Sequence, residues 1–240
     1  MRMQSIIRAI YPSQCVACDT PTVDDFGLCG PCWSQTDFIG GMICDQCNAP
    51  MSGGDADEIM QCDDCLRIAR PWSKGRAVFR YHGVGRKLAL AFKHSDRTDL
   101  TRPISQWMAQ RARPLLTQNS VIVPVPLHWV RLMRRRYNQS ALLATGIARE
   151  LDCPVIADAL LRPKPTRPLK GANRTQRFET LIDAIALNPR RQAQLLDQSV
   201  LLVDDVMTSG ATMAAAAEAC FQAGAARVDM VVLARSVKDA

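Results

Sequence analysis

Eight of the ten cysteines of this chain lie within its first 65 residues, where they form four Cys-x-x-Cys pairs. The pairs are Cys15/Cys18, Cys29/Cys32, Cys44/Cys47 and Cys62/Cys65. Each pair makes a tight turn that can aim two thiolates at one ion, and zinc takes four such ligands in a tetrahedron. We therefore expect two closed, structural zinc ions, which supply most of the folding energy of a module too small to bury a large core.

The spacing leaves the grouping of the four pairs open. Sequential grouping places the first four cysteines on one ion and the last four on the other, whereas a crossed arrangement joins alternate pairs. Disulfide or redox chemistry is the alternative to metal. The start of the chain argues against it, because a short apolar stretch broken by Arg8 makes a poor export signal. Cys153 and Cys220 stand in apolar contexts and are expected to be core thiols.

The pattern of residues changes near position 66, from cysteines, Gly and Asp to the periods of an α/β domain. We expect a zinc module at 1–70 and a second domain at 71–240. Strands are predicted at 76–83, 120–126, 200–203 and 228–236, helices at 86–94, 102–116, 140–151 and 212–223, a basic loop before 140, and a long proline-rich loop at 162–177. Strands that alternate with helices predict a mainly parallel sheet with helices on both faces.

Charge and hydropathy narrow the expected partners and compartment. The formal net charge is +7, yet up to Cys65 the only basic residues are Arg2 and Arg8, so the positive charge lies in the second domain. A basic domain favours polyanions such as nucleic acid or phosphorylated metabolites, the alternative being a merely solvated face. No window of about 18 uninterrupted apolar residues is present, so we expect a cytoplasmic protein without membrane insertion.

Residues 200–213, VLLVDDVMTSGATM, combine a buried strand, two acids and a hydroxyl-rich loop that leads into a helix. Ligands of parallel sheets bind at the carboxyl ends of strands, where this loop would offer hydroxyls and backbone N–H groups to a phosphate. Gly210 would let the backbone approach closely. Asp204 and Asp205 would repel a phosphate unless they meet ribose hydroxyls or Mg²⁺. We expect a phosphorylated ribose, and the alternative is a helix-capping loop that binds nothing.

This segment resembles the diphosphate-sugar motif of the type I phosphoribosyltransferases, which implies that fold and phosphoribosyl diphosphate as the ligand. The resemblance implies that Asp204 and Asp205 hold the ribose hydroxyls and the metal. It gives the 5-phosphate to the loop residues Thr208, Ser209, Gly210, Ala211 and Thr212. A loop after an upstream strand, VPVPLHWVRLMRRRYNQS, matches the family's pyrophosphate loop, in which Arg135 and Arg136 would grip the pyrophosphate. Asp204, Asp205 and Arg135 are the candidate catalytic residues.

The order of the motifs resembles the ComF family from end to end: four cysteine pairs, FRYHGVGRKLALAFKH, the segment with RRRYNQ, the proline loop and the motif at 200–213. That family is implicated in bacterial natural competence, where it handles incoming single-stranded DNA on the cytoplasmic side. The resemblance implies phosphoribosyl diphosphate and single-stranded DNA as partners, with other DNA-uptake or recombination proteins as further candidates. The candidate nucleic-acid residues are Tyr137, Arg134, Arg174 and Arg177.

An active transferase with an unidentified acceptor is the alternative function, and an adaptor that has lost its ligand is a third. Purine-salvage relatives of this fold have an Asp where this chain has Thr208, so the group that takes or steers the base proton is missing. The intact residues of the 200–213 motif argue against the adaptor. Lys93 is a candidate for a phosphate role. Exposed aromatic side chains could stack bases, but Trp72, Phe79, Tyr81 and Trp129 are each expected first in the core or at a domain interface.

Overall fold

The computed structural model describes residues 12–23, 25–52, 60–94, 97–163 and 184–237. Its centre is a four-stranded sheet in the order β1-β6-β5-β2, in which every neighbouring pair is parallel. The strands of this sheet are β1 (Gly75–Arg80), β2 (Ser120–Pro124), β5 (Ser199–Met207) and β6 (Arg227–Arg235). A short antiparallel pair, β3 (Leu160–Leu161) and β4 (Ala186–Leu187), lies outside the sheet.

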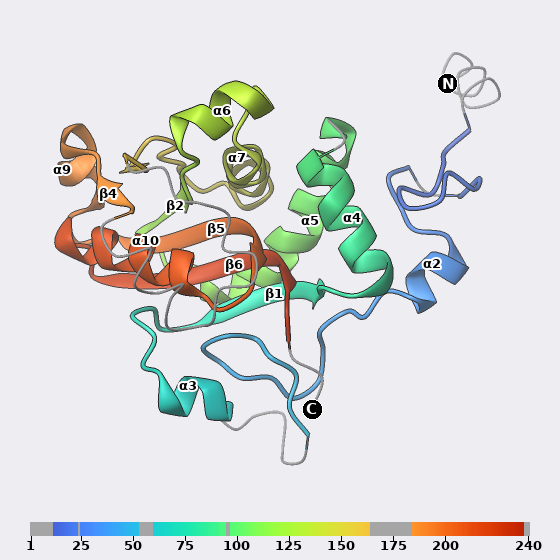
Figure 1. Ribbon diagram of the computed structural model, residues 1–240, viewed down its shortest axis with the longest axis horizontal. Helices are drawn as coiled ribbons and strands as arrows, with labels where there is room; N and C mark the ends of the chain where they lie inside the picture. The colour runs from blue at the N-terminus through green and yellow to red at the C-terminus, as the bar shows by residue number, and fades with distance from the viewer. Residues whose placement is uncertain (1–11, 24, 53–59, 95–96, 164–183, 238–240) are drawn as a thin grey trace.

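Helices cover both faces of the sheet (Figure 1). One face carries α4 (Gly83–His94), α5 (Thr101–Ala112) and α7 (Gln139–Leu151), and the other carries α10 (Ala211–Gln222). Along β5, Leu201 and Val203 pack on the first face, while Val200 and Leu202 pack on the second. Because successive side chains of a strand point to opposite faces, a strand covered on both sides is apolar throughout. The predicted phosphoribosyltransferase-like α/β architecture is confirmed.

Shorter elements complete the chain. They are α2 (Gly30–Ser34), α3 (Asp63–Arg67), α6 (Trp129–Arg135), α9 (Gln192–Leu195) and single 3₁₀ turns at Thr98–Leu100, Arg113–Leu115 and Pro189–Arg191. Most of the predicted proline-rich loop lies outside the described residues.

The sequence-based expectation is wrong at two places near the sheet edge. The strand predicted at 200–203 continues through Met207, because its pairing with β6 includes Asp204 opposite Val232 and Met207 opposite Arg235. The expected basic loop contains helix α6. His128 caps this helix, since its Nδ1 accepts a hydrogen bond from the backbone N–H of Val130 at 3.3 Å.

The cysteine-rich part of the chain packs against the edge strand β1. The backbone N–H of Ile39 donates to Val78 O at 3.0 Å, that of Arg80 to Asp37 O at 2.8 Å, and that of Gly75 to Asp45 O at 2.8 Å. These bonds cover a strand edge that would otherwise expose unpaired groups. As a result, buried cysteines share hydrophobic clusters with the sheet: Cys15 and Cys32 on the side of α4, α5 and α7, and Cys44, Cys47 and Cys65 on the side of α10.

Candidate functional site

The eight paired cysteines form two clusters, each with four sulfur atoms within 4.8 Å of one another. The first cluster contains Cys15, Cys18, Cys29 and Cys32, and the second contains Cys44, Cys47, Cys62 and Cys65. The pairs are therefore grouped sequentially. All ten cysteines are described, and all are free thiols rather than disulfides.

The spacing of the sulfur atoms fits tetrahedral zinc. Zn–S bonds of about 2.3 Å separate the sulfurs of a tetrahedron by about 3.8 Å. Cys18 Sγ and Cys29 Sγ are 3.6 Å apart, as are Cys47 Sγ and Cys62 Sγ. Four thiolates leave no open position on the metal, so the geometry suits two structural zinc ions.

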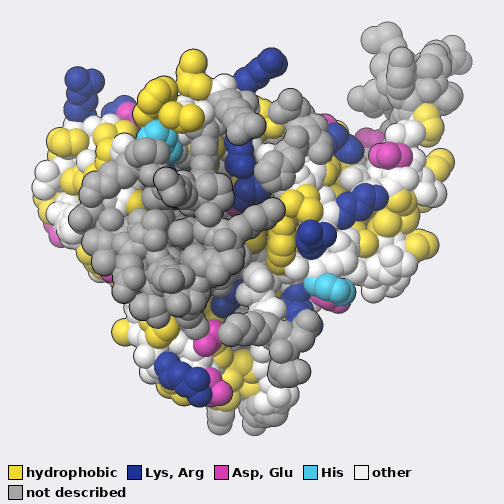
Figure 2. All heavy atoms as spheres, viewed as in Figure 1, with side chains coloured by type: hydrophobic (Ala, Val, Ile, Leu, Met, Phe, Trp, Pro, Cys, Tyr) yellow, Lys and Arg dark blue, Asp and Glu magenta, His cyan; other side chains and the backbone are white. Residues whose placement is uncertain are grey.

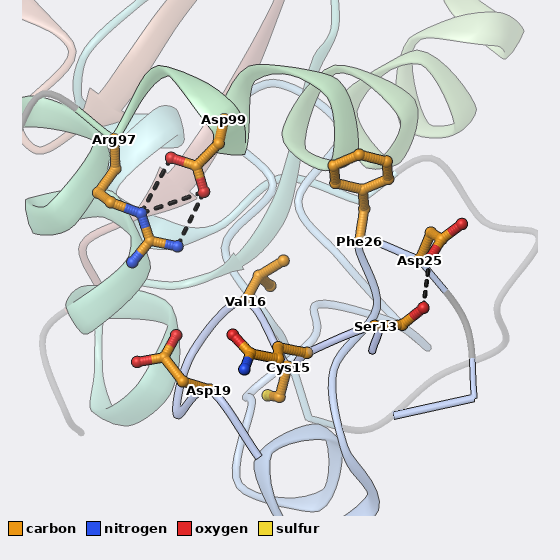
Figure 3. Close-up of a pocket in the computed structure, with 9 residues that line it drawn as sticks. Ser13, Cys15, Val16, Asp19, Asp25, Phe26, Arg97 and Asp99 are labelled. Atoms are coloured by element: carbon orange, nitrogen blue, oxygen red, sulfur yellow. Dashed lines mark hydrogen bonds and ion pairs between the residues drawn. The ribbon is translucent and has the colours of Figure 1, made fainter. Parts of the chain in front are cut away.

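A pocket adjoins the first cysteine cluster at Cys15 and Val16 (Figure 3). Arg97 forms one side of it and is held by Asp99, with Nε to the carboxylate at 2.9 and 3.1 Å and Nη2 at 2.8 Å. Asp19 and Asp25 add further negative charge to the lining. None of the residues predicted to bind phosphate or ribose lines this pocket, and its acidic lining does not suit an anion.

A second pocket is built by the segment singled out in the sequence. It is lined by Asp204 and by residues 206–213, which end β5 and begin α10. Gly210 caps the helix with φ of 83°, a conformation that glycine adopts without strain. The twelve-residue helix α10 points its N-terminus at this pocket, where the N–H groups of its first turn and the helix dipole favour an anion.

The two adjacent acids differ in their surroundings. Asp204 is half-buried, lines the pocket, and accepts a hydrogen bond from Ser140 Oγ at 2.8 Å. Asp205 is only 6% exposed, is absent from the lining, and forms an ion pair with Lys93, whose Nζ lies 2.7 Å from Oδ2 and 3.0 Å from Oδ1. Of the two acids, the structure therefore brings Asp204 to the loop at 208–212.

Negative charge is in excess at the acid pair. Burial and the charge of Asp205 raise the pKa of Asp204 to about 6, against the lowering effects of Lys93 and Ser140. One ammonium group faces two carboxylates, so a further cation or a pair of hydroxyl donors would stabilise the ionised form. This fits the Mg²⁺ and ribose hydroxyls expected from the sequence.

The arginine-rich segment lies beside the acid pair. Arg135, the last residue of α6, is half-buried, and its Nη1 approaches Gln139 Oε1 at 3.4 Å. Gln139 in turn donates to the backbone carbonyl of Lys93 at 3.3 Å. Arg136 is exposed and ends α6 in the left-handed region, with φ of 66°. The side chain of Arg134, and all of Arg174 and Arg177, lie outside the described residues.

The aromatic candidates separate into two groups. Trp72 and Phe79 are buried, at 1% and 0% exposure, so they cannot stack on a nucleic acid. Tyr81 and Tyr137 are half-buried. Trp129 is 66% exposed, and with Val130, Leu132 and Met133 it forms an apolar patch on α6, visible as yellow side chains at the top of Figure 2.

Comparison with known proteins supports both halves of the molecule. The double zinc ribbon domain model matches residues 6–66, and the phosphoribosyl transferase domain model matches residues 138–239. The chain is 28% identical to DNA utilization protein YhgH of Escherichia coli strain K12, over 94% of this chain and 98% of that protein. It is 27% identical to Competence protein F of Haemophilus influenzae, over 88% and 91% of the two chains. Identity to Competence protein ComFC of Bacillus subtilis is also 27%, over 88% and 85%.

The chain thus joins a double zinc ribbon to a phosphoribosyltransferase domain, and its homologues carry the names DNA utilization protein YhgH, Competence protein F and Competence protein ComFC. The matched zinc ribbon holds both cysteine clusters, and the matched phosphoribosyltransferase domain holds Ser140, Asp204 and the loop at 208–212. Lys93 and Arg135 fall between the two matched ranges; the fold brings Lys93 to Asp205, and Arg135 to Gln139, the neighbour of Ser140. Among the described residues, no helix is long and apolar enough to cross a bilayer.

Sequence reasoning missed several residues of the site. Ser140 follows the RYNQ segment, and only the meeting of α7 with β5 places it on Asp204. Arg70 and Arg235 belong to no motif in the sequence, but each is buried and donates to a backbone carbonyl of the loop at 208–212. Local composition does not indicate which charged residue is buried, so these contacts are visible only in three dimensions.

Proposed function

We propose that this chain binds phosphoribosyl diphosphate together with Mg²⁺ at the pocket between β5 and α10. The observation that carries the proposal is the phosphate loop at 208–212, which begins α10 directly beside the adjacent carboxyl groups of Asp204 and Asp205. A helix N-terminus takes a phosphate, and neighbouring carboxylates need hydroxyls or a cation. A ribose that carries both a 5-phosphate and a diphosphate supplies each of these groups.

Each residue of the pocket has a defined part in this proposal. Thr208, Ser209, Gly210, Ala211 and Thr212 hold the 5-phosphate through hydroxyls and backbone N–H groups. Asp204 binds the ribose hydroxyls and the metal, while Asp205 forms an ion pair with Lys93. Arg135 and Arg136 bind the diphosphate, because guanidinium groups form strong bidentate bonds to phosphate oxygens. Asp204 and Asp205 would hold Mg²⁺, which would supply positive charge against the diphosphate.

Binding without transfer is the favoured activity. A transferase needs a group that accepts or steers the proton of its acceptor. Within the described lining of the pocket, Asp204 is the one titratable side chain, and it is committed to ribose and metal in this proposal. Thr208 stands where purine-salvage enzymes place an acid, and a threonine hydroxyl is a poor base.

We further propose that the ligand-bound protein handles single-stranded DNA in the cytoplasm. Its relatives carry the names DNA utilization protein and Competence protein, and its positive charge lies on the domain that contains the site. Helix α6 begins with exposed Trp129 and ends at Arg135, with exposed Arg136 after it, a combination that lets bases stack while arginines bind the phosphates. Tyr137 and Arg134 continue this surface in sequence, and Arg174 and Arg177 are the proposed contribution of the proline-rich segment.

Isothermal titration of the zinc-loaded protein with phosphoribosyl diphosphate tests the proposal. We expect Mg²⁺-dependent binding at one site per chain, lost in the double variant Asp204→Asn with Asp205→Asn. Both variant residues remain polar and similar in size, so circular dichroism and a zinc content of two per chain should be unchanged. Asp99→Asn, an acid of the pocket at the first cluster, is the matched control and should bind normally. No binding by the folded wild type, or equal affinity in the double variant, contradicts the proposal.

A pyrophosphate assay separates binding from transfer. Protein, ligand and Mg²⁺ are incubated with and without nucleobases, and free pyrophosphate is measured. We expect no release above the uncatalysed background. Release that depends on an added base would identify an active phosphoribosyltransferase with that base as its acceptor.

A further inference from the structure

Two buried arginines donate hydrogen bonds to backbone carbonyls of the phosphate loop. Arg70 Nη1 donates to the carbonyl of Ser209 at 2.9 Å, and Arg235 Nη1 donates to the carbonyl of Thr208 at 2.6 Å. The two residues are 7% and 4% exposed. They are far apart in the sequence, Arg70 before β1 and Arg235 at the end of β6.

These bonds fix the direction of the loop's N–H groups. In a trans peptide the carbonyl and the N–H of the same unit point in opposite directions. A guanidinium that holds the carbonyl of Thr208 therefore turns the N–H of Ser209 away from itself, and the bond to Ser209 does the same for the N–H of Gly210. Among the described residues neither N–H has an acceptor. Two consecutive N–H groups held in this way form a concave site for an anion.

Both arginines also connect to the second cysteine cluster, Arg235 directly and Arg70 through Trp72. Arg235 Nε donates to the carbonyl of Cys47 at 3.1 Å. Trp72 packs against Arg70, with the guanidinium 5.5 Å from the ring centroid, and Trp72 Nε1 donates to the carbonyl of Gln46, between Cys44 and Cys47, at 2.6 Å.

Charge explains why two arginines stand at this cluster. A zinc ion held by four thiolates carries a net formal charge of about −2. A buried charge of that size is stable only with opposite charge nearby, and the same is true of two buried guanidinium groups. Arg70 shows the need directly, since its Nε and Nη2 are buried without a hydrogen-bond partner in the described part of the chain. A zinc-loaded second cluster would offset the charge of these two arginines.

The phosphate loop packs closely against Arg70 and Trp72 at Gly210. A Cβ atom added at Gly210 would lie 3.0 Å from Arg70 Nη1 and 3.0 Å from Trp72 Cη2. Contacts this close mean that the glycine rests directly on the layer formed by Arg70 and Trp72. A shift of that layer would therefore move the loop.

We propose that Arg70 and Arg235 are positioning residues that connect the second zinc site to the phosphate loop, so that anion binding at the loop depends on zinc in the second cluster and not in the first. The inference rests on the proposed function for its ligand. The thiolate charge holds the two guanidinium groups, and these hold the two carbonyls that aim Ser209 and Gly210 at the phosphate. Because coupling between two sites is reciprocal, ligand at the loop must also retain zinc in the second cluster.

The test compares Arg70→Met with Arg111→Met. Arg111 is the control: it is half-buried and, like Arg70, joins the two parts of the chain, through the carbonyls of Ala77 and Ile39, but within the described residues it makes no hydrogen bond to the loop. Zinc release to a chromogenic chelator is followed without ligand and with phosphoribosyl diphosphate and Mg²⁺. Cys18→Ser, which disrupts the first cluster, assigns the release phase of the second. Affinity is measured by isothermal titration.

We expect Arg70→Met to speed zinc release from the second cluster several-fold, to abolish its slowing by ligand, and to weaken ligand binding at least tenfold. Arg111→Met should change neither release nor affinity by more than twofold. Arg70→Lys, which keeps the charge but not the guanidinium fork, should retain zinc like the wild type and still bind at least fivefold more weakly.

Wild-type zinc release and affinity in Arg70→Met, or wild-type affinity in Arg70→Lys, would overturn the connection. The ligand-free release rates separate this inference from the proposed function. If the wild type binds no phosphoribosyl diphosphate, the function fails, while equal release from Arg70→Met and the wild type refutes the Arg70 connection on its own.

Discussion

The two cysteine clusters share a motif and differ in what surrounds them. In the first cluster Cys18 is exposed and Cys29 half-buried, and the neighbouring pocket is lined by acids and by an arginine already bound to Asp99. In the second cluster Cys44, Cys47 and Cys65 are buried against the face of the sheet that carries α10. Here Arg235 joins the carbonyl of Cys47 to that of Thr208, and Arg70 binds the carbonyl of Ser209. Under our proposal, the same set of four cysteines stabilises a module at one site and also supports a ligand site at the other.

Serine substitutions in the two clusters should give the largest difference in ligand affinity. We choose Cys18→Ser for the first cluster and Cys62→Ser for the second, because both positions are the more accessible members of their sets. Each variant should lose about one zinc per chain, since three thiolates hold zinc poorly. Only Cys62→Ser should weaken phosphoribosyl diphosphate binding, by more than tenfold. Elemental analysis and titration measure both quantities, and an equal loss of affinity in the two variants would remove the distinction between the clusters.

The acid pair, Asp204 and Asp205, offers a test at the ligand site itself, because a substitution there should leave both cysteine clusters unchanged. The pKa of Asp204, about 6, lies above the ordinary value of about 3.8. Its proton therefore stabilises the folded protein fully below about pH 4, and this contribution is lost as the pH rises through 6. Asp204→Asn removes the repulsion with Asp205 and can still accept from Ser140. It should raise the melting temperature of the ligand-free protein by a few degrees at pH 7.5 and less at pH 5.

The melting temperatures of wild type and Asp204→Asn are compared at both pH values without Mg²⁺. Zinc content should stay at two per chain in the variant, which shows that the clusters are intact. If the variant is less stable than the wild type at pH 7.5, then ionised Asp204 does not destabilise the ligand-free protein, and our interpretation of this residue is wrong.

Two exposed tryptophans, one on α6 and one near the first cluster, allow a comparison of nucleic-acid binding. This is the smallest effect that we expect. Trp129 on α6 is 66% exposed, and Trp33 on α2, near the first cluster, is 56% exposed. Stacking of one base on an aromatic side chain contributes about 1–3 kcal/mol. Trp129→Ala should therefore weaken binding of a fluorescent single-stranded oligonucleotide about five-fold or more at low salt, and Trp33→Ala should not. A stronger effect of Trp33→Ala would move the proposed interface to the zinc module.

Local patterns predicted much of the fold and part of the site. The four cysteine pairs, the apolar strand at 200–203 and the helix after Gly210 each depend on neighbours in sequence, and the structure confirms them. The family resemblance also pointed to the loop at 208–212, which lies where an anion site is expected.

Long-range contacts could not be predicted in the same way. Arg70 and Ser209 are 139 residues apart, and Lys93 and Asp205 are 112 apart, so no local period relates them. Helix α6 was expected as a loop, because its run of arginines and exposed apolar residues lacks the one-sided pattern of a helix packed on a core. The pairing of β5 with β6, rather than the two acids themselves, decides where the strand ends.

A crystal structure of the zinc-loaded protein with phosphoribosyl diphosphate and Mg²⁺ tests the central claim most directly. The account predicts the 5-phosphate within about 3 Å of the backbone N–H groups of Ser209 and Gly210. It also predicts the metal or the ribose hydroxyls at Asp204, with Arg70 and Arg235 still bound to the loop carbonyls. Ligand bound elsewhere on the protein, or a 5-phosphate at the loop with both arginines turned away from it, would contradict the account.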